Sequence, residues 1–299
     1  MIRPFVSLFA GLIASLLLTP LSEASQNGCQ HWPLGMVFMG LTERGWETYH
    51  VFSEGQAPQA LSTNGEIRTP VLSSTKEALF YIDEAAQVNR FSIADKKVSR
   101  LLTATQQASY TQPETDGDNK TLYIVQLQQG KSIDTDIVAL DLVTQKITTV
   151  ITQRSAQFEP HLSPPWLYYS NVHCVLSCGN IIQEIWRYHL VSGQAEQITL
   201  LNNISRQPAV DQHNKWLYFS SNVAGNYHIY RQSLQQTKAS PEPLTEGAVT
   251  DSSPALYQDR LYFIRQQAQQ TSLMCRTPQG ELRSLPLPEG ITQLRDLDI

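Results

Sequence analysis

Polar residues stand immediately before regularly spaced prolines, and they are the side chains of this sequence best suited to holding a ligand. Five such segments precede prolines and a sixth aligns with them: Arg68-Thr69, Thr111-Gln112, Phe158-Glu159, Arg206-Gln207, Asp251-Ser252-Ser253 and Leu294-Arg295. Arginine pairs its parallel N–H groups with a carboxylate, so the set could bind an acidic ligand or a peptide terminus. The alternative, which we favour, is that these side chains join neighbouring structural units through hydrogen bonds.

His161 is the histidine whose position is most suggestive of chemistry, because it directly follows Pro160 in this pattern. A general base needs a partner and a substrate pocket, and no Asp or Ser at motif spacing accompanies it. The nucleophile motif G-x-S-x-G is also missing from the sequence. The sequence therefore does not indicate an enzyme, and the residues that remain as ligand-binding candidates are Arg68, Gln112, Glu159, His161, Arg206, Asp251 and Arg295.

Four cysteines, an even number, suggest disulfide bonds in an oxidising compartment. Cys174 and Cys178 are close enough in sequence to close a small ring, and Cys29 with Cys275 is the remaining pair. This second bond would join the two ends of the folded domain. A zinc site is the alternative, but His173, Cys174 and Cys178 lack the C-x2-C spacing, so we predict no metal and no cofactor.

The N-terminus has the three parts of a secretory signal within residues 1–24. Arg3 supplies the positive charge, residues 5–18 form an apolar segment too short to span a membrane, and Ser22-Glu23-Ala24 is a small-x-small cleavage site. The sequence therefore predicts a periplasmic or secreted protein with no membrane span in the mature chain. The formal net charge of -5 and the lack of a basic block argue against nucleic acid as a partner, and we expect a monomer.

An internal repeat is visible in the spacing of Pro70, Pro113, Pro160, Pro208 and Pro254, which are separated by 43, 47, 48 and 46 residues. An apolar and aromatic strand begins seven or nine residues after each proline, at 79–82, 122–124, 167–169, 217–219 and 261–263. Third strands are predicted at 88–93, 136–142, 185–190, 229–234 and 273–277, and fourth strands at 101–103, 147–151, 197–199, 244–245 and 282–285. Such runs, separated by polar breaks, are typical of consecutive antiparallel strands.

The two ends of the sequence supply a further unit. Strand signals at 35–41, 48–52 and 60–62 match the second, third and fourth strands, while residues 290–299 align with 248–256 and place Asp296 at the proline position, 42 residues beyond Pro254. We therefore predict an all-β, six-bladed β-propeller with four antiparallel strands per blade and a first blade completed by the C-terminal strand. A β-sandwich, the competing fold, does not explain the spacing. The predicted blades are 29–63 with 291–299, 64–104, 105–153, 154–201, 202–247 and 248–290.

The stretch 205–245 contains the best-preserved copy of the repeat. Its residues 220–230, SSNVAGNYHIY, followed by Leu244-Thr245, resemble the TolB-like propeller repeat, which combines a Pro-containing inner strand, a Ser-Asn-x-x-Gly-Asn turn and a closing Leu-Thr. The resemblance extends over nearly the whole mature chain. It implies a fold like the propeller half of periplasmic TolB, which binds other envelope proteins, but without the α/β domain that precedes the propeller there.

These observations lead to two hypotheses about function. The first is a protein-binding or scaffolding module of the bacterial cell envelope, whose partner is an envelope or periplasmic protein. The alternative is a propeller enzyme or sensor that binds a carbohydrate or peptide in the central channel. Because the first strands of a propeller line that channel, we expect the candidate side chains near its mouth.

Overall fold

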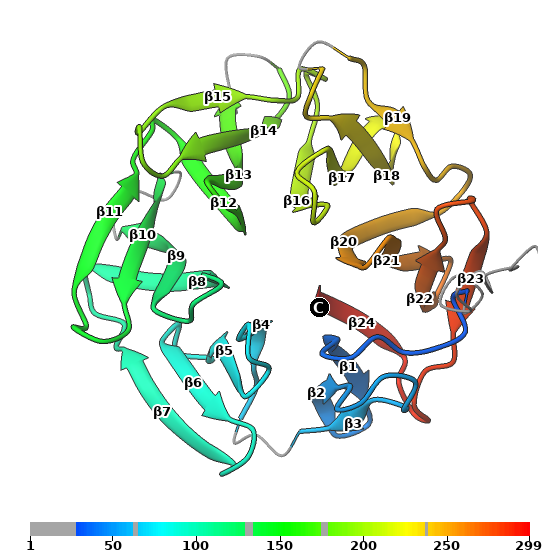
Figure 1. Cartoon of the computed structure of the whole chain (residues 1–299), viewed down its shortest axis with the longest axis horizontal. Coiled ribbons are helices and arrows are strands. Elements are labelled where there is room, and N and C mark those ends of the chain that lie inside the picture. The colour runs from blue at the N-terminus through cyan, green and yellow to red at the C-terminus, as the bar shows by residue number, and fades with distance from the viewer. Residues whose placement is uncertain (1–27, 62–64, 129–133, 175–178, 237–238) are drawn as a thin grey trace, which may run out of the picture.

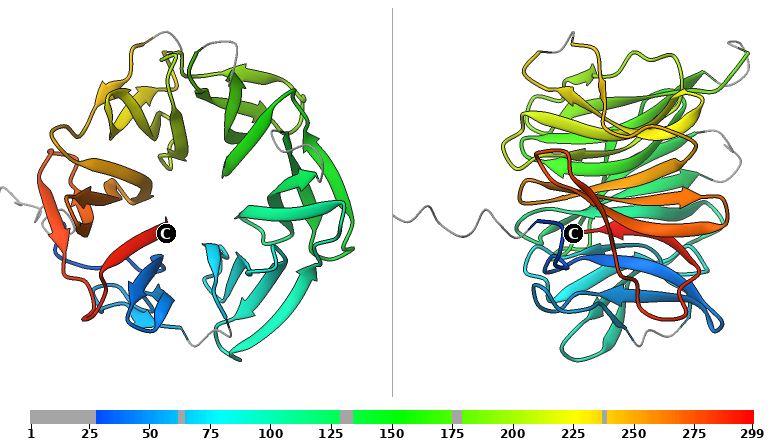
Figure 2. Two further views of the ribbon diagram at one scale, coloured as in Figure 1. Left: turned by 180° about the vertical axis from the view of Figure 1, so that it is seen from behind. Right: turned by 90° about the vertical axis from the view of Figure 1, so that its right-hand side faces the viewer.

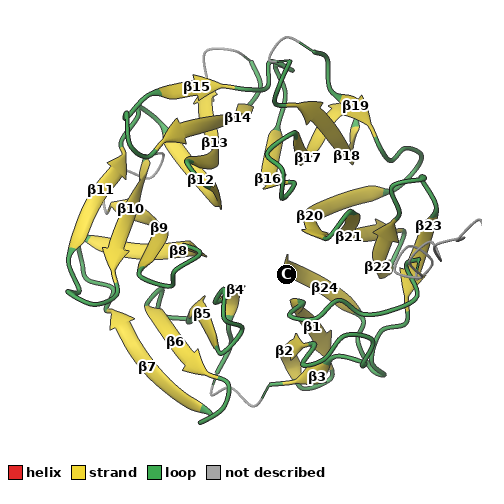
Figure 3. Cartoon of the chain, in the orientation of Figure 1, coloured by secondary structure: helices red, strands yellow, loops and turns green. Residues whose placement is uncertain are grey.

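The computed structural model describes residues 28–61, 65–128, 134–174, 179–236 and 239–299. Within these ranges the chain forms 24 strands and no helix, and hence no helix long and apolar enough to cross a membrane. The strands form blades arranged in a ring around a central axis (Figure 1), and loops alone connect them (Figure 3). The predicted signal, residues 1–24, lies outside the described residues.

The first three blades each contain four antiparallel strands that follow one another from the channel outward. Blade 1 contains β24 (Gln293–Asp298), β1 (Val37–Thr42), β2 (Gly45–His50) and β3 (Gln59–Ala60). Blade 2 contains β4 (Arg68–Leu72), β5 (Ala78–Ile82), β6 (Val88–Ser92) and β7 (Lys97–Leu102). Blade 3 contains β8 (Ala108–Thr115), β9 (Thr121–Gln128), β10 (Thr135–Asp141) and β11 (Ile147–Ile151).

The remaining blades repeat this arrangement. Blade 4 contains β12 (Ala156–Ser163), β13 (Trp166–Cys174), β14 (Ile182–His189) and β15 (Ala195–Gln197). Blade 5 contains β16 (Ser205–Val210), β17 (Trp216–Ala224), β18 (Asn226–Ser233) and β19 (Glu242–Pro243). Blade 6 contains β20 (Thr250–Tyr257), β21 (Arg260–Gln267), β22 (Gln270–Arg276) and β23 (Leu282–Leu285).

The predicted six-bladed propeller is confirmed, although two of its blades share one continuous sheet. Four blades are separate four-stranded sheets, and blades 3 and 4 form an eight-stranded sheet. Their connection is a single parallel bridge between Thr135 and Ala156. Views from behind and from the side show the same ring of stacked blades (Figure 2).

The C-terminal strand completes the first blade, as predicted. β24 pairs antiparallel with β1, and its Leu294 is buried in the hydrophobic cluster between blades 1 and 6. One detail of the predicted alignment is wrong, because Leu297, and not Asp296, takes the place of the proline. Asp296 has a φ of 54°, which matches the φ of 53° at Ser253, the residue before Pro254. The last repeat contains no proline at this position, so the sequence offered no residue by which to fix its alignment.

The recurring aromatic motif of the second strands packs between neighbouring blades. Leu79, Leu217, Phe219 and Phe263 are fully buried. Leu79 of blade 2, for example, packs in one cluster with Val37 of blade 1. Because close-packed interiors tolerate little change in volume, the repetition of this motif follows from the need to hold the blades together.

A disulfide bond joins Cys29 to Cys275, with 5.5 Å between their Cα atoms. Cys29 precedes β1, and Cys275 lies on β22 of blade 6, so the bond links the two ends of the ring. This predicted pair is confirmed. The other predicted pair, Cys174 with Cys178, includes a residue outside the described ranges, Cys178.

Candidate functional site

A bulge interrupts the inner strand of every blade at the same place. The residue at this bulge has a positive φ in all six blades, between 45° and 58°. A bulge bends its strand and re-aims a side chain, and in this propeller that side chain faces the channel cavity described below. We refer to these residues as the bulge ring: Thr69, Gln112, Glu159, Gln207, Ser253 and Asp296.

Four side chains of the bulge ring accept a hydrogen bond from a backbone N–H of the next blade. In each of the following pairs the side chain of the first residue accepts from the backbone N–H of the second: Gln112 and Glu159 (2.9 Å), Glu159 and Gln207 (2.7 Å), Gln207 and Ser253 (2.9 Å), and Asp296 and Thr69 (3.2 Å). Glu159 also accepts a hydrogen bond from the Ser170 hydroxyl. These side chains therefore tie neighbouring blades together around the channel.

A second layer of polar side chains lies two residues further along three inner strands. Each of its members accepts a backbone N–H from the next blade: Glu114 from Leu162 (3.0 Å), His161 from Val210 (3.2 Å) and Asp298 from Leu72 (2.9 Å). Like the bulge ring, the members of this layer face the channel cavity.

The two layers line a cavity of about 230 Å3 in the channel. Its polar lining includes the carboxyl groups of Glu114, Glu159, Asp296 and Asp298 together with the imidazole of His161. Neither lysine nor arginine is among the described residues that line it. Within the described part of the chain, no group of three His, Cys, Asp or Glu side chains is arranged to hold a metal ion.

Burial changes the ionisation of the side chains in this cavity. It raises the pKa of all four carboxyl groups, and the charge of Asp298 raises the pKa of Glu114 further. Hydrogen bonds to the Glu159 carboxylate oppose the rise of its pKa. Burial lowers the pKa of His161 to about 4, so its imidazole is uncharged at neutral pH and is able to accept a backbone N–H.

The three arginines predicted as ligand-binding candidates occupy the position before the bulge ring, and they do not line the cavity. We refer to Arg68, Arg206 and Arg295 as the arginine mouth. The guanidinium of Arg206 lies over the ring of Tyr227, at 4.2 Å from its centroid. Such stacking fixes the orientation of the guanidinium and leaves its edge free to donate hydrogen bonds.

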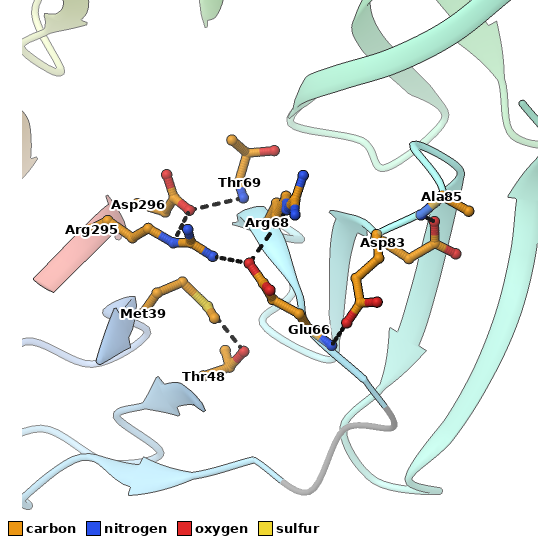
Figure 4. Close-up of polar contacts among 10 residues, drawn as sticks. Met39, Thr48, Glu66, Arg68, Thr69, Asp83, Ala85, Arg295 and Asp296 are labelled. Carbon is orange, nitrogen blue, oxygen red and sulfur yellow. Dashed lines mark hydrogen bonds and ion pairs between the residues drawn. The ribbon is translucent and has the colours of Figure 1, made fainter. Parts of the chain in front are cut away.

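Arg295 is held in a similar way on blade 1. Its guanidinium lies 4.1 Å from the ring centroid of Trp46 and donates to the Glu66 carboxylate at 2.7 Å. Arg68 approaches the same carboxylate at 3.4 Å, and half of its side chain is exposed. Figure 4 shows both arginines converging on Glu66, with Asp296 of the bulge ring beside them.

Asp251 lies inside blade 6. Its carboxylate is fully buried and forms two hydrogen bonds with the guanidinium of Arg265, at 2.7 and 2.8 Å. The backbone carbonyl of Asp251 accepts the hydroxyl of Ser220 from blade 5. Asp251 therefore faces its own blade and is separated from the other candidates.

The structure thus divides the predicted candidates into three groups. Gln112, Glu159 and His161 line the cavity, the three arginines stand outside its lining, and Asp251 pairs with Arg265 inside blade 6. Sequence reasoning missed Glu114 and Asp298, which also line the cavity. A signal for them exists, because both stand two residues beyond the bulge position of their repeats.

Comparison with known proteins finds similarity at the level of structure. No family model and no curated protein matches the chain. The crystal structure of TolB from Acinetobacter baumannii is similar at a TM-score of 0.71 and 14% identity, over 88% of this chain and 66% of that one. This chain therefore spans about two thirds of the length of that TolB. A putative TolB from Agrobacterium tumefaciens gives a TM-score of 0.67 at 14% identity, over 85% of this chain and 89% of that one.

Other propellers are similar to a comparable degree. A chain of a nidogen/laminin complex has a TM-score of 0.68 at 12% identity, with 88% of this chain and 97% of that one covered. An oligogalacturonate lyase in complex with manganese has a TM-score of 0.59 at 12% identity, with 87% and 77% covered. At these identities the similarity shows the fold alone, a β-propeller similar to that of the TolB structures.

Proposed function

We propose that this chain is an exported propeller that binds another protein of the bacterial cell envelope, with the arginine mouth as its recognition surface. The observation that supports this most directly is the way Arg206 and Arg295 are held over aromatic rings at the channel entrance. Arginine and aromatic residues are enriched among the residues that dominate binding energy at protein interfaces. A guanidinium already held in place loses little conformational entropy when it binds.

Three further findings support the proposal. The Cys29–Cys275 disulfide suits an oxidising compartment such as the periplasm. One of the similar structures is a TolB and another a putative TolB, and a further similar chain was solved in a complex of nidogen with laminin. The inter-blade hydrogen bonds of the bulge ring give the mouth a rigid frame, as a preformed binding surface requires.

An affinity capture from envelope extract tests this function. The mature chain, immobilised through a tag, should retain a defined partner, and the variant R68A/R206A/R295A should lose it. A matched control, K97A/R100A/K146A, removes three exposed positive charges from or beside the outer strands β7 and β11 and should retain the partner. Equal capture by both triple variants, or no defined partner for the folded wild type, would refute the proposal.

The cavity favours a second candidate function, a ligand-binding sensor or enzyme acting in the channel. A carboxyl group with a raised pKa, such as that of Glu159, is suited to general acid chemistry. Two of the predicted candidates, Glu159 and His161, face this cavity. If E159Q and H161Q leave the binding and turnover of a carbohydrate and peptide panel unchanged, this second function is excluded.

A further inference from the structure

A groove separate from the channel cavity lies where the ring closes, between blade 6 and the inner strand of blade 1. It has a volume of about 460 Å3. Its lining is Thr250, Ser252, Ile264, Gln266, Ala268, Gln269, Thr271, Thr292, Gln293 and Leu294. Neither a charged nor an aromatic residue is among the described residues of this lining. We refer to it as the seam groove.

At the seam groove, blade 6 carries two small side chains where blades 1 and 5 each carry a pair of large ones. In blade 5 Arg206 lies over Tyr227, and the strand register places Ser252 and Thr271 at the equivalent positions of blade 6. Blade 1 has the same arrangement, with Arg295 over the ring of Trp46. A serine and a threonine therefore leave open the space that a stacked arginine and an aromatic ring fill in blades 1 and 5.

Most side chains of the seam groove can form hydrogen bonds, and most of these form none with other described residues. The carboxamides of Gln266, Gln269 and Gln293 are exposed, and none of them forms a hydrogen bond with another described residue. The hydroxyls of Ser252 and Thr271 are also free of such bonds within the described chain. Each carboxamide offers both donors and an acceptor, so the groove can bond to groups that themselves donate and accept.

Two buried apolar side chains complete the groove. Ile264 and Leu294 expose only 4% and 8% of their surfaces, and they give the groove an apolar floor beneath its amide and hydroxyl walls. A charged ligand would lose hydration there without gaining an opposite charge. An uncharged molecule with many hydroxyl groups and apolar C–H faces fits both parts of the lining.

We propose that the seam groove is a binding site for a neutral carbohydrate. The site does not depend on the proposed protein-binding function, because its lining shares no residue with the arginine mouth. Sugar hydroxyls bond to the carboxamides of Gln266, Gln269 and Gln293, while the sugar ring rests on Ile264 and Leu294. Ser252 adjoins Ser253 of the bulge ring, so a bound sugar would lie beside the channel entrance.

Titration of the isotope-labelled mature chain with maltose, cellobiose and N,N′-diacetylchitobiose tests the site. At least one of these probes should shift the side-chain amide resonances of Gln266, Gln269 and Gln293 in a saturable manner. The variant S252R/T271Y, which copies the blade 5 pair into blade 6, should abolish these shifts. Galacturonic acid, an anionic sugar, should not produce them.

A second variant keeps the test decisive if S252R/T271Y fails to fold. The substitutions Q266L/Q269L remove two exposed carboxamides and should weaken sugar binding about tenfold, the change expected when one or two neutral hydrogen bonds are lost. Q106L/Q107L, at two exposed glutamines next to blade 3, is the matched control and should bind as the wild type does. Failure of every neutral probe to bind, or undiminished binding by folded Q266L/Q269L, would overturn the proposal.

Discussion

The bulge ring and the arginine mouth are one residue apart in sequence, yet their side chains are used in different ways. Glu159 and Gln207 of the bulge ring accept hydrogen bonds from the next blade. Arg206, the neighbour of Gln207, lies over an aromatic ring and keeps part of its surface exposed. Neighbouring residues of a strand point to different faces, so Arg206 and Gln207 can have different partners. In a propeller, polarity near the channel therefore does not by itself identify a binding residue.

Deletion of residues 291–299 would affect the bulge ring and the arginine mouth together, and we expect it to lower the stability of the protein more than any other change considered. The deletion removes Arg295, Asp296 and the inner strand of blade 1. Burial of Leu294 and its apolar neighbours contributes about 1.5–3 kcal/mol per side chain, against a total stability of about 5–15 kcal/mol. The truncated chain should not unfold cooperatively in a thermal melt followed by circular dichroism. V143S, at an exposed position, serves as control, and an unchanged melt of the truncated chain would contradict closure by β24.

The second prediction concerns the pH dependence of stability at His161. Its folded-state pKa of about 4 lies below the ordinary value of 6.5, so its stabilising contribution is present above pH 6.5 and is lost as the pH falls toward 4. This change amounts to at most about 3 kcal/mol. Urea unfolding of the wild type and of H161Q at pH 7 and pH 4.5 should show a larger loss in the wild type.

The carboxyl groups of the cavity have the opposite effect on the pH dependence of stability. Their raised pKa values mean that stability is lost as the pH rises through those values. Both proteins carry these carboxyl groups, so the difference between wild type and H161Q isolates the histidine. An equal loss in the two proteins would show that His161 takes up its proton in the folded state as readily as in the unfolded state.

The third prediction compares two substitutions at Glu159. Alanine leaves the Gln207 N–H and the Ser170 hydroxyl without their acceptor, and this should cost about 1–3 kcal/mol. Glutamine retains an acceptor oxygen and should cost less. Chemical denaturation at pH 7 measures both, and equal losses for E159A and E159Q would argue against a hydrogen-bonding role of the carboxylate.

The smallest effect is expected at the arginine mouth. R206A removes a partly exposed side chain whose stacking on Tyr227 is worth about 0.5–1 kcal/mol. Its unfolding free energy should therefore fall by less than that of E159A when measured in the same buffer. If R206A is as destabilising as E159A, the arginine mouth contributes as much to stability as the bulge ring does, contrary to what their contacts indicate.

The repeat made the fold predictable from the sequence. Regular prolines and the Leu-Tyr-Phe strands recur because every blade must pack against two neighbours, and the C-terminal strand carries the same pattern as residues 248–256. Cys29 and Cys275 were predicted to pair because they are the two cysteines left once Cys174 is paired with Cys178, and the structure contains this bond. These features are set by local composition and spacing, which a sequence displays directly.

The positions of the side chains in the channel were harder to predict from the sequence. A bulge inserts an extra residue, so the face that Asp296 or Glu159 presents depends on backbone geometry that composition does not display. Asp251 precedes the bulge and pairs with Arg265 inside its blade, a contact that no motif marks. Glu114 and Asp298 approach each other only because the ring brings distant repeats together.

Closure by β24 also governs the order in which the molecule can be completed. Thr292 forms its hydrogen bonds with Leu41, 251 residues earlier in the chain. Contacts between such distant residues form slowly, because the intervening chain must first be brought into place. During synthesis the first blade is thus left without its inner strand until residues 293–298 have been made.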